Sequence, residues 1–211
     1  LLCSYLCTDG LPIDESPLFD PRNPFKNRDP RCTASIVEFG TQWLGFTYQP
    51  HPDTLKVKNW KTGGLVTNND NRANAQFASF NGMMFKKGID EDWTDDYKAE
   101  NTNFIMRYAD VLLMYAEAKT ELGEIDQAML DASINKVRAR AYKVAVTDKT
   151  KYPAVTSTNQ AAVRKAVRIE RRMELVLEGR RYEDLIRWKL AEKHLSKDMY
   201  GMLDPADLRT K

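Results

Sequence analysis

The sequence predicts a mainly α-helical protein whose helical hairpins adjoin a loop-rich arm with a few short strands. Two observations carry this prediction. From residue 104 onward, apolar residues recur at the helical period over long segments. Before that point Pro, Gly, Asn and Asp are dense, and seven of the nine prolines fall in residues 1–52, which disfavours long helices. We therefore predict a loop-rich arm over residues 1–103, a helical region over 104–195 and a polar tail over 196–211.

The arm contains short segments with strand-like composition, separated by turn signals such as DGLP, QPHPD and TNNDN. The predicted strands are Thr33–Phe39, Thr41–Tyr48 and Phe77–Phe85. Because these segments are short and interrupted, we expect the arm to pack on the helices rather than fold alone.

Four helices are predicted in the second half of the chain. Gly123 ends the first and Gly179 ends the third, which Ser157 or Thr158 could cap. The predicted ranges are Asn103–Leu122, Glu124–Ala141, Asn159–Glu178 and Tyr182–Leu195.

The first two helices resemble one tetratricopeptide hairpin, because small residues let the helices approach and Gly123 makes a tight turn. A simple αα-hairpin that does not belong to a repeat array is an equally good interpretation, because a single repeat is a weak signal.

Composition limits the function classes. The chain has 211 residues, 42% of them apolar, which suits one domain or one domain plus an arm. Its net charge of +2, from 32 basic and 30 acidic residues, gives no electrostatic reason to expect nucleic acid. No apolar run is long enough to span a bilayer. With two histidines and no recognisable catalytic motif, we expect no enzyme.

Metal and cofactor signals are equally weak. Cys3, Cys7 and Cys32 are an odd number, and we interpret them as small buried hydrophobes rather than as a disulfide framework or a zinc site. Acidic residues crowd two loops, 9–20 and 90–96, which we interpret as solvated. Calcium is the alternative for either loop, and no other cofactor is expected.

Charged residues crowd the segment RKAVRIERRMELVLEGRRYEDLIRW, residues 164–188. Opposite charges stand three and four apart, and the simpler interpretation is an exposed, salt-bridged helix surface in which each pair contributes only about 0.3–0.5 kcal/mol. The alternative is that some of these groups are partly buried and lock helix to helix and loop. Under either interpretation they are structural: Arg107, Asp110, Glu170, Arg171, Glu174, Glu178, Arg180 and Asp184.

Aromatic residues of the arm supply the candidate ligand site. Most of them should be core, but four have polar, Gly or Pro neighbours and are expected near the surface. A ring there can cover the C–H face of a sugar while polar groups bind its hydroxyls. The candidates are Trp43, Tyr48, Trp60 and Trp93.

Three stretches together resemble the SusD/RagB family of surface glycan-binding lipoproteins of Bacteroidetes. They are TDGLPIDESPLFDP with FKNRDPR, then KKGID with RYADVLLMYAEAKTELG and INKVRARA, and finally IERRMELVLEGRRYEDLIRW. Their order and spacing also fit. A full member is much longer and usually has a Pro-Ile-Pro and Asn-Pro-rich tail, so we expect this chain to correspond to a C-terminal portion.

The resemblance implies a tetratricopeptide-like scaffold that binds a polysaccharide or oligosaccharide at the cell outer membrane. It implies a partner, a SusC-like TonB-dependent transporter to which nutrient is delivered, and a surface-exposed lipoprotein whose lipid anchor lies upstream of this chain. Sugar contacts vary between members, so none is carried over by motif. The alternative is a tetratricopeptide-like module that binds protein or peptide and has no sugar affinity.

Overall fold

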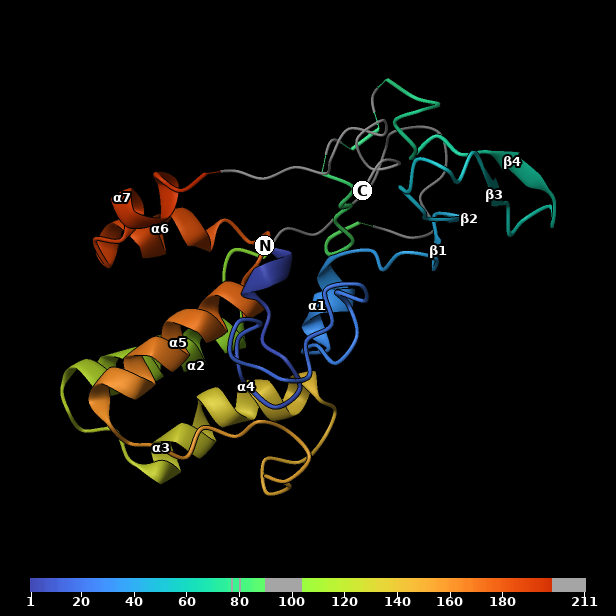
Figure 1. Ribbon diagram of the computed structural model, residues 1–211. Helices are drawn as coiled ribbons and strands as arrows, with labels where there is room; N and C mark the ends of the chain where they lie inside the picture. Colours follow the sequence, from blue (N-terminus) through green and yellow to red (C-terminus); the bar gives the residue numbers. More distant parts are fainter. Residues whose placement is uncertain (77, 80, 90–103, 199–211) are drawn as a thin grey trace. The chain divides into compact units, whose positions relative to one another are not determined.

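The computed structural model describes residues 1–76, 78–79, 81–89 and 104–198 (Figure 1). The chain divides into two compact units. The first combines Leu1–Cys32 with Asn103–Lys189, and the second combines Thr33–Thr102 with Leu190–Lys211. Residues 1–32 therefore belong with the helices, whereas the sequence placed them in the arm.

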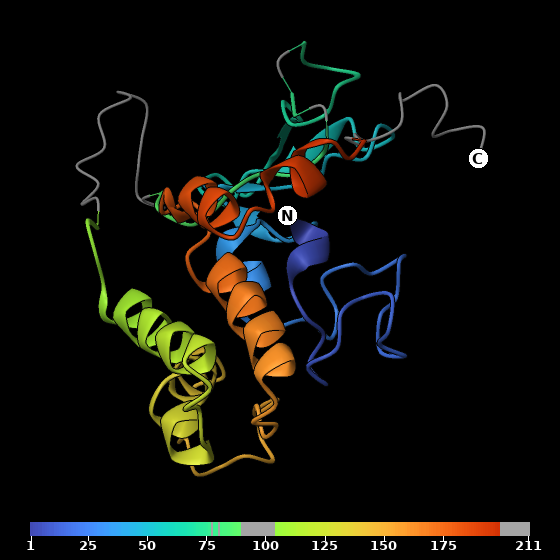
Figure 2. The ribbon, with the colours of Figure 1, turned by 90° about the vertical axis from the view of Figure 1, so that its left-hand side faces the viewer.

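The first unit is helical, which confirms the predicted fold class. A short 3-10 helix, η1 (Leu2–Ser4), opens the chain and α1 (Arg31–Ser35) follows at the division between the units. The larger helices are α2 (Tyr108–Glu121), α3 (Gln127–Ala132), α4 (Ile134–Ala141), α5 (Gln160–Glu174) and α6 (Arg180–Arg187). Figures 1 and 2 show α2 and α5 running side by side, and this pair makes the most extensive helix–helix contact.

Local chemistry explains where these helices begin and end. Gly123 follows α2 with a left-handed φ of +72°, so it ends that helix as predicted. Asn159 caps α5, because its Oδ1 accepts a hydrogen bond of 3.1 Å from the Ala162 amide. The cap is thus neither Ser157 nor Thr158. Asp126 caps α3 in the same way through the Met129 amide.

Two predicted helices are each broken in two. The second is interrupted at Ser133, whose φ of −126° and ψ of −94° are not helical, so it forms α3 and α4. The fourth is interrupted at Lys189, whose φ is +55°, and forms α6 and then α7 (Ala191–Leu195). Apolar periodicity did not reveal either break, because the pattern continues across both.

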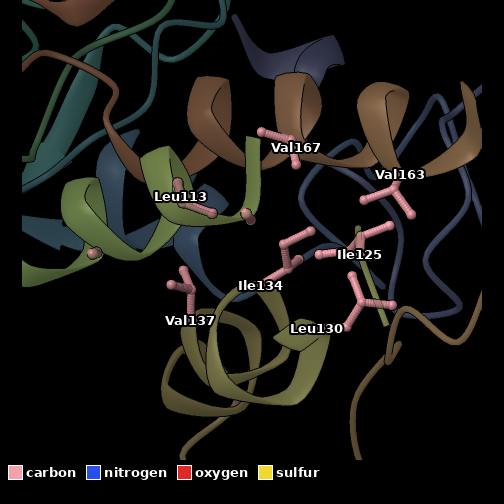
Figure 3. Close-up of a cluster of buried hydrophobic side chains, with 9 residues drawn as sticks. Leu113, Ile125, Leu130, Ile134, Val137, Val163 and Val167 are labelled. Carbon is pink, nitrogen blue, oxygen red and sulfur yellow. The ribbon is translucent and has the colours of Figure 1, made fainter. Parts of the chain in front are cut away.

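A single apolar cluster lies between α2, α3, α4 and α5 (Figure 3). Leu113 comes from α2, while Val163 and Val167 come from α5, and all three are fully or almost fully buried. Ala109 and Ala116 on α2 belong to the same cluster. Their small side chains allow the close approach that the tetratricopeptide-like pattern predicted. Burial of this apolar surface is the main force that holds the helices together.

The N-terminal segment is attached to α5. The Leu6 amide donates to Met173 Sδ at 3.4 Å, and Arg172 Nε donates to Ser4 Oγ at 2.6 Å. Arg28 is buried and donates to the carbonyls of Leu2 and Tyr5, both at 2.7 Å. One guanidinium thus satisfies several carbonyls of a segment that has little regular structure.

The second unit contains short antiparallel strands. β1 (Gln42–Trp43) pairs with β2 (Phe46–Thr47), and β3 (Lys56–Lys58) pairs with β4 (Leu65–Thr67). A bridge between Phe46 and Asn59 joins the two hairpins. Leu44 and Gly45 both have positive φ, as a two-residue hairpin loop requires.

The predicted strands are only partly correct. Thr41–Tyr48 forms a hairpin rather than one strand, and the first residues of Thr33–Phe39 belong to α1. Phe77–Phe85 lies partly outside the described residues, and Phe85 makes a bridge to Ile36. β3 and β4 were not predicted, because the lysines and glycines in and beside them obscure the alternation of apolar and polar residues.

Asparagine side chains replace regular structure in the loop between the hairpins. Asn68 and Asn71 are fully buried. The Asn68 amide donates to the carbonyls of Gln49 and Thr54, both at 2.7 Å, and the Asn71 amide donates to the carbonyl of His51 at 2.6 Å. The TNNDN segment, which indicated only a turn, is therefore the support of the β2–β3 loop.

Within the part of the chain that the structure describes, no helix combines the length and the apolarity needed to cross a bilayer.

The core makes a direct stability prediction. Leu113→Ala removes a side chain that is 0% exposed and should lower the free energy of unfolding by about 2–5 kcal/mol, through lost burial and a residual cavity. Leu122→Ala, at a position 67% exposed beyond the end of the same helix, is the matched control and should change it by less than about 0.5 kcal/mol. Urea unfolding of both variants measures the difference, and equal effects would contradict this assignment of the core.

Candidate functional site

Two glutamates one turn apart on α5 form the centre of a buried ionic network. Glu170 and Glu174 are 0% and 2% exposed, and their spacing places them on one face of the helix. Arg31, at the start of α1, donates through Nη1 to Glu170 Oε1 at 2.6 Å and to Glu174 Oε2 at 2.9 Å. Asp29 binds the other side of the same guanidinium, at 2.7 and 2.9 Å. One arginine thus connects the N-terminal segment to α5.

Three further arginines complete this network. Arg138 of α4 donates to Glu170 Oε2 at 2.8 Å. Arg107, which precedes α2, donates to Glu174 Oε1 at 2.6 Å and binds Glu178 with two hydrogen bonds of 2.7 and 2.8 Å. Arg140 also reaches Glu174 Oε1, at 2.7 Å. Both glutamates therefore have each carboxylate oxygen paired with an arginine, as buried charges require.

A second set of ion pairs connects α2, α5 and α6. Arg171 is buried and donates to Asp110 Oδ1 at 2.8 Å and to Asp184 Oδ2 at 2.9 Å. Asp184 also accepts from Arg187 at 2.7 Å. Arg180 lies 3.3 Å from Asp110 Oδ2 and donates to the carbonyl of Ile105. Arg171 thus fixes the start of α2 to α6.

These contacts decide between the two interpretations of the charged segment. An exposed salt-bridged surface is wrong for Glu170, Arg171, Glu174 and Asp184, all of which are buried. It holds for Arg164, whose pair with Glu121 at 2.6 Å is largely in solvent. The sequence showed which residues carry charge, but Arg31, the partner of Glu170 and Glu174, lies 139 and 143 positions away from them, and only the fold brings these residues together.

The network changes the acidity of Glu174. Burial alone would raise the pKa of Glu174, but the charge of Arg31, the hydrogen bond from Arg107 and the charge of Arg140 outweigh it and lower the pKa to about 2. The carboxylate is thus ionised at neutral pH and already paired. Such a group holds the structure together, because both of its oxygens accept hydrogen bonds from arginines.

The candidate ligand residues do not share one environment. Trp43 and Tyr48 are 4% and 1% exposed and pack with Val37, so the expectation that they lie near the surface is wrong. Tyr48 Oη donates to the carbonyl of Gly82 at 2.9 Å, and burial raises the pKa of its phenol. The polar neighbours that indicated exposure are turn residues of the hairpin. Trp93 lies outside the described residues.

Trp60 is the candidate that the structure leaves accessible, with 46% of its surface exposed. Its amide donates to the carbonyl of Gly45 at 2.8 Å, and its indole Nε1 donates to Thr47 Oγ1 at 3.1 Å. Lys58 Nζ lies 3.9 Å from the ring centroid. The ring is therefore fixed in position before any ligand binds.

The exposed side of the β3–β4 hairpin continues from this ring. Val57 points inward and is buried, so Lys56 and Lys58 point outward by strand alternation. The register places Leu65 opposite Lys58 and Thr67 opposite Lys56, on the same outward side. We call this set the Trp60 surface; it consists of Lys56, Lys58, Trp60, Leu65 and Thr67. Apart from the nearby Trp60, nothing in the sequence indicated that these lysines and Leu65 lie on a candidate ligand surface.

A second exposed surface lies on α2. The side of this helix away from Leu113 is also apolar, and we call it the α2 face: Tyr108, Val111, Met114, Tyr115 and Leu122 are all exposed. A helix that is apolar on both sides is normally covered on both sides. The α2 face therefore has the composition of a contact surface.

Metal ligands do not gather in the described part of the chain, where no group of three or more His, Cys, Asp and Glu side chains could hold an ion. In the first acidic loop, Asp9 accepts from Ser16 and Leu11, and Asp20 accepts from Arg22 and Asn23. These carboxylates stabilise turns. The second acidic loop, residues 90–96, lies outside the described residues. Cys7 and Cys32 are buried as expected, whereas Cys3 is exposed.

The ionic network makes a pH-dependent prediction. Because the folded-state pKa of Glu174 is about 2 against an ordinary value of 4.5, its stabilisation is complete above pH 4.5 and is lost as the pH falls toward 2. Glu174→Gln should therefore lower the free energy of unfolding by about 3 kcal/mol at pH 7. This difference from the unsubstituted protein should shrink as the pH falls through that range.

The matched control is Glu121→Gln, which breaks the solvent-exposed pair with Arg164 and should cost less than about 1 kcal/mol. Chemical denaturation at several pH values measures both variants. A cost for Glu174→Gln that does not change between pH 7 and pH 3 would show that ionisation of this group is not what stabilises the fold.

Comparison with known proteins gives the same family throughout. A sequence profile of the SusD family matches residues 1–206. A SusD-like carbohydrate binding protein of Bacteroides fragilis has 34% sequence identity and a TM-score of 0.70 over 95% of this chain. A second SusD-like protein of the same organism has 24% identity and a TM-score of 0.61 over 91% of the chain, which supports the fold.

The match covers only part of these relatives. The chain spans 36% and 35% of the two solved chains. SusD-like protein P38 of Formosa agariphila is 35% identical over 89 residues, which are 42% of this chain and 17% of that protein. Because the family profile extends over nearly the whole sequence and the fold agrees with it, this chain belongs to the SusD family.

Proposed function

We propose that this protein binds a polysaccharide or oligosaccharide at the cell surface and delivers it to a TonB-dependent outer-membrane transporter, without breaking a bond in it. Membership of the SusD family and the similarity to a SusD-like carbohydrate binding protein support the binding role. The outer-membrane location, the lipid anchor and the SusC-like partner are part of the proposal.

The observation in this chain that carries the proposal is the exposed and fixed ring of Trp60. Since the Gly45 carbonyl binds the Trp60 backbone amide and Thr47 Oγ1 binds the indole, little conformational entropy would be lost when a sugar stacks on the ring. A flat aromatic surface beside Thr and Lys side chains offers the apolar and polar contacts that a pyranose presents.

Trp60→Ala provides the test. We expect the full-length protein to be retarded by at least one polysaccharide in affinity electrophoresis, and Trp60→Ala to weaken that binding about tenfold or more, since loss of one aromatic platform costs on the order of 1–3 kcal/mol. Phe46→Ala is the matched control, because Phe46 is also exposed but opposes Asn59 in the bridge that joins the hairpins. If both variants lose glycan affinity equally, or if neither loses it, Trp60 is not part of the binding site.

The α2 face favours a second function, a docking surface for a protein partner. Its five apolar residues stand on a helix whose other side is already occupied by the core. Exposed apolar patches of this kind mark protein contacts. The Trp60 surface and the α2 face belong to different units of the chain.

Charge introduced into the α2 face tests this role. We expect Val111→Glu with Tyr115→Glu to abolish co-purification of the full-length protein with its transporter while glycan binding persists. Leu18→Glu, at an exposed apolar position of the N-terminal segment, is the control and should leave co-purification intact. Unchanged co-purification of the double variant would exclude the α2 face as the docking surface.

A further inference from the structure

We propose that the Trp60 surface selects anionic glycans, those whose sugars carry carboxylate or sulfate groups. This inference rests on the proposed glycan-binding function and specifies its substrate class. The evidence is the charge of the hairpin that presents Trp60 and the position of those charges relative to the ring.

The hairpin carries cations only. Residues 54–67 contain Lys56, Lys58 and Lys61 and no Asp or Glu. The whole chain is nearly neutral, with 32 basic and 30 acidic residues, so this segment differs from the rest. Elsewhere in the described chain, basic groups commonly have acidic partners, such as Lys119 with Glu124 and Lys149 with Asp131.

The lysines of the Trp60 surface have no such partner within the part of the chain that the structure describes. Among the described residues, no carboxylate pairs with Lys56 or Lys58, and both side chains are exposed. The contact that Lys58 makes is with the Trp60 ring, where its ammonium lies 3.9 Å from the centroid. A cation left in solvent can bind an anion without first breaking an internal ion pair, so its charge is available to a ligand.

The geometry matches one sugar unit with an anionic substituent. The Lys58 ammonium lies over one face of the Trp60 ring, so a pyranose that stacks on this face displaces it, and the displaced ammonium stays within reach of a carboxylate or sulfate on the sugar. Lys56 lies two residues further along the same outward side of β3, toward the next unit of an extended chain. Leu65 and Thr67 stand opposite these lysines and supply one apolar and one hydroxyl contact.

Matched polysaccharides that differ only in charge test the inference on the full-length protein. The probes are polygalacturonate against its methyl ester, and carrageenan against its desulfated form, compared by calorimetry or affinity electrophoresis. We expect tighter binding of the anionic member of at least one pair. Lys56→Gln with Lys58→Gln should weaken that binding by about tenfold, on the basis of about threefold for each exposed charge contact. Increasing salt should weaken it as well.

Lys26→Gln, an exposed lysine outside the hairpin, is the control for loss of net charge and should have no effect. Equal binding of charged and neutral members in both pairs would overturn the inference and leave glycan binding standing. Binding of anionic lipid vesicles but of no polysaccharide would overturn both, as would no binding of any kind. Weakening by Lys26→Gln as large as that of the double variant would also overturn it, because the effect would then come from overall charge.

Discussion

The helical unit depends on the pairing of two buried glutamates with four arginines. Glu170 and Glu174 on α5 bind Arg31, Arg107, Arg138 and Arg140, which come from three other parts of the chain. An unpaired carboxylate at these positions would carry a large desolvation penalty. The four arginines therefore hold α4, the start of α2 and the N-terminal segment on α5.

Apolar burial and ion pairing have different roles here. The cluster around Leu113 and Val167 supplies the general driving force, but apolar contacts tolerate small shifts of one helix on another. The guanidinium–carboxylate geometry does not, since two hydrogen bonds from Arg107 to Glu178 fix both distance and orientation. The position of the N-terminal segment follows from the same chemistry, because Arg31 and Arg28 hold a stretch with little regular structure of its own.

The second unit is organised by another principle. Its strands are only two or three residues long, and side-chain amides of Asn68 and Asn71 bind the carbonyls that a longer sheet would pair. Such a unit can present Trp60 and its lysines in a fixed arrangement while most of the surrounding backbone is loop. Aromatic rings are divided accordingly: Trp43 and Tyr48 form the small core, and Trp60 remains at the surface.

By itself, the sequence determined the mainly helical class, the start of the helical region after residue 103, the glycine that ends α2 and the family, because periodicity, turn residues and the three motif stretches are local properties. It also identified the charged residues and the aromatic candidates. Only the tertiary structure decided that Glu170 and Glu174 are buried and that Trp43 and Tyr48 are core whereas Trp60 is exposed. Burial depends on contacts between distant residues, as between Arg31 and Glu170, and no local pattern encodes such contacts.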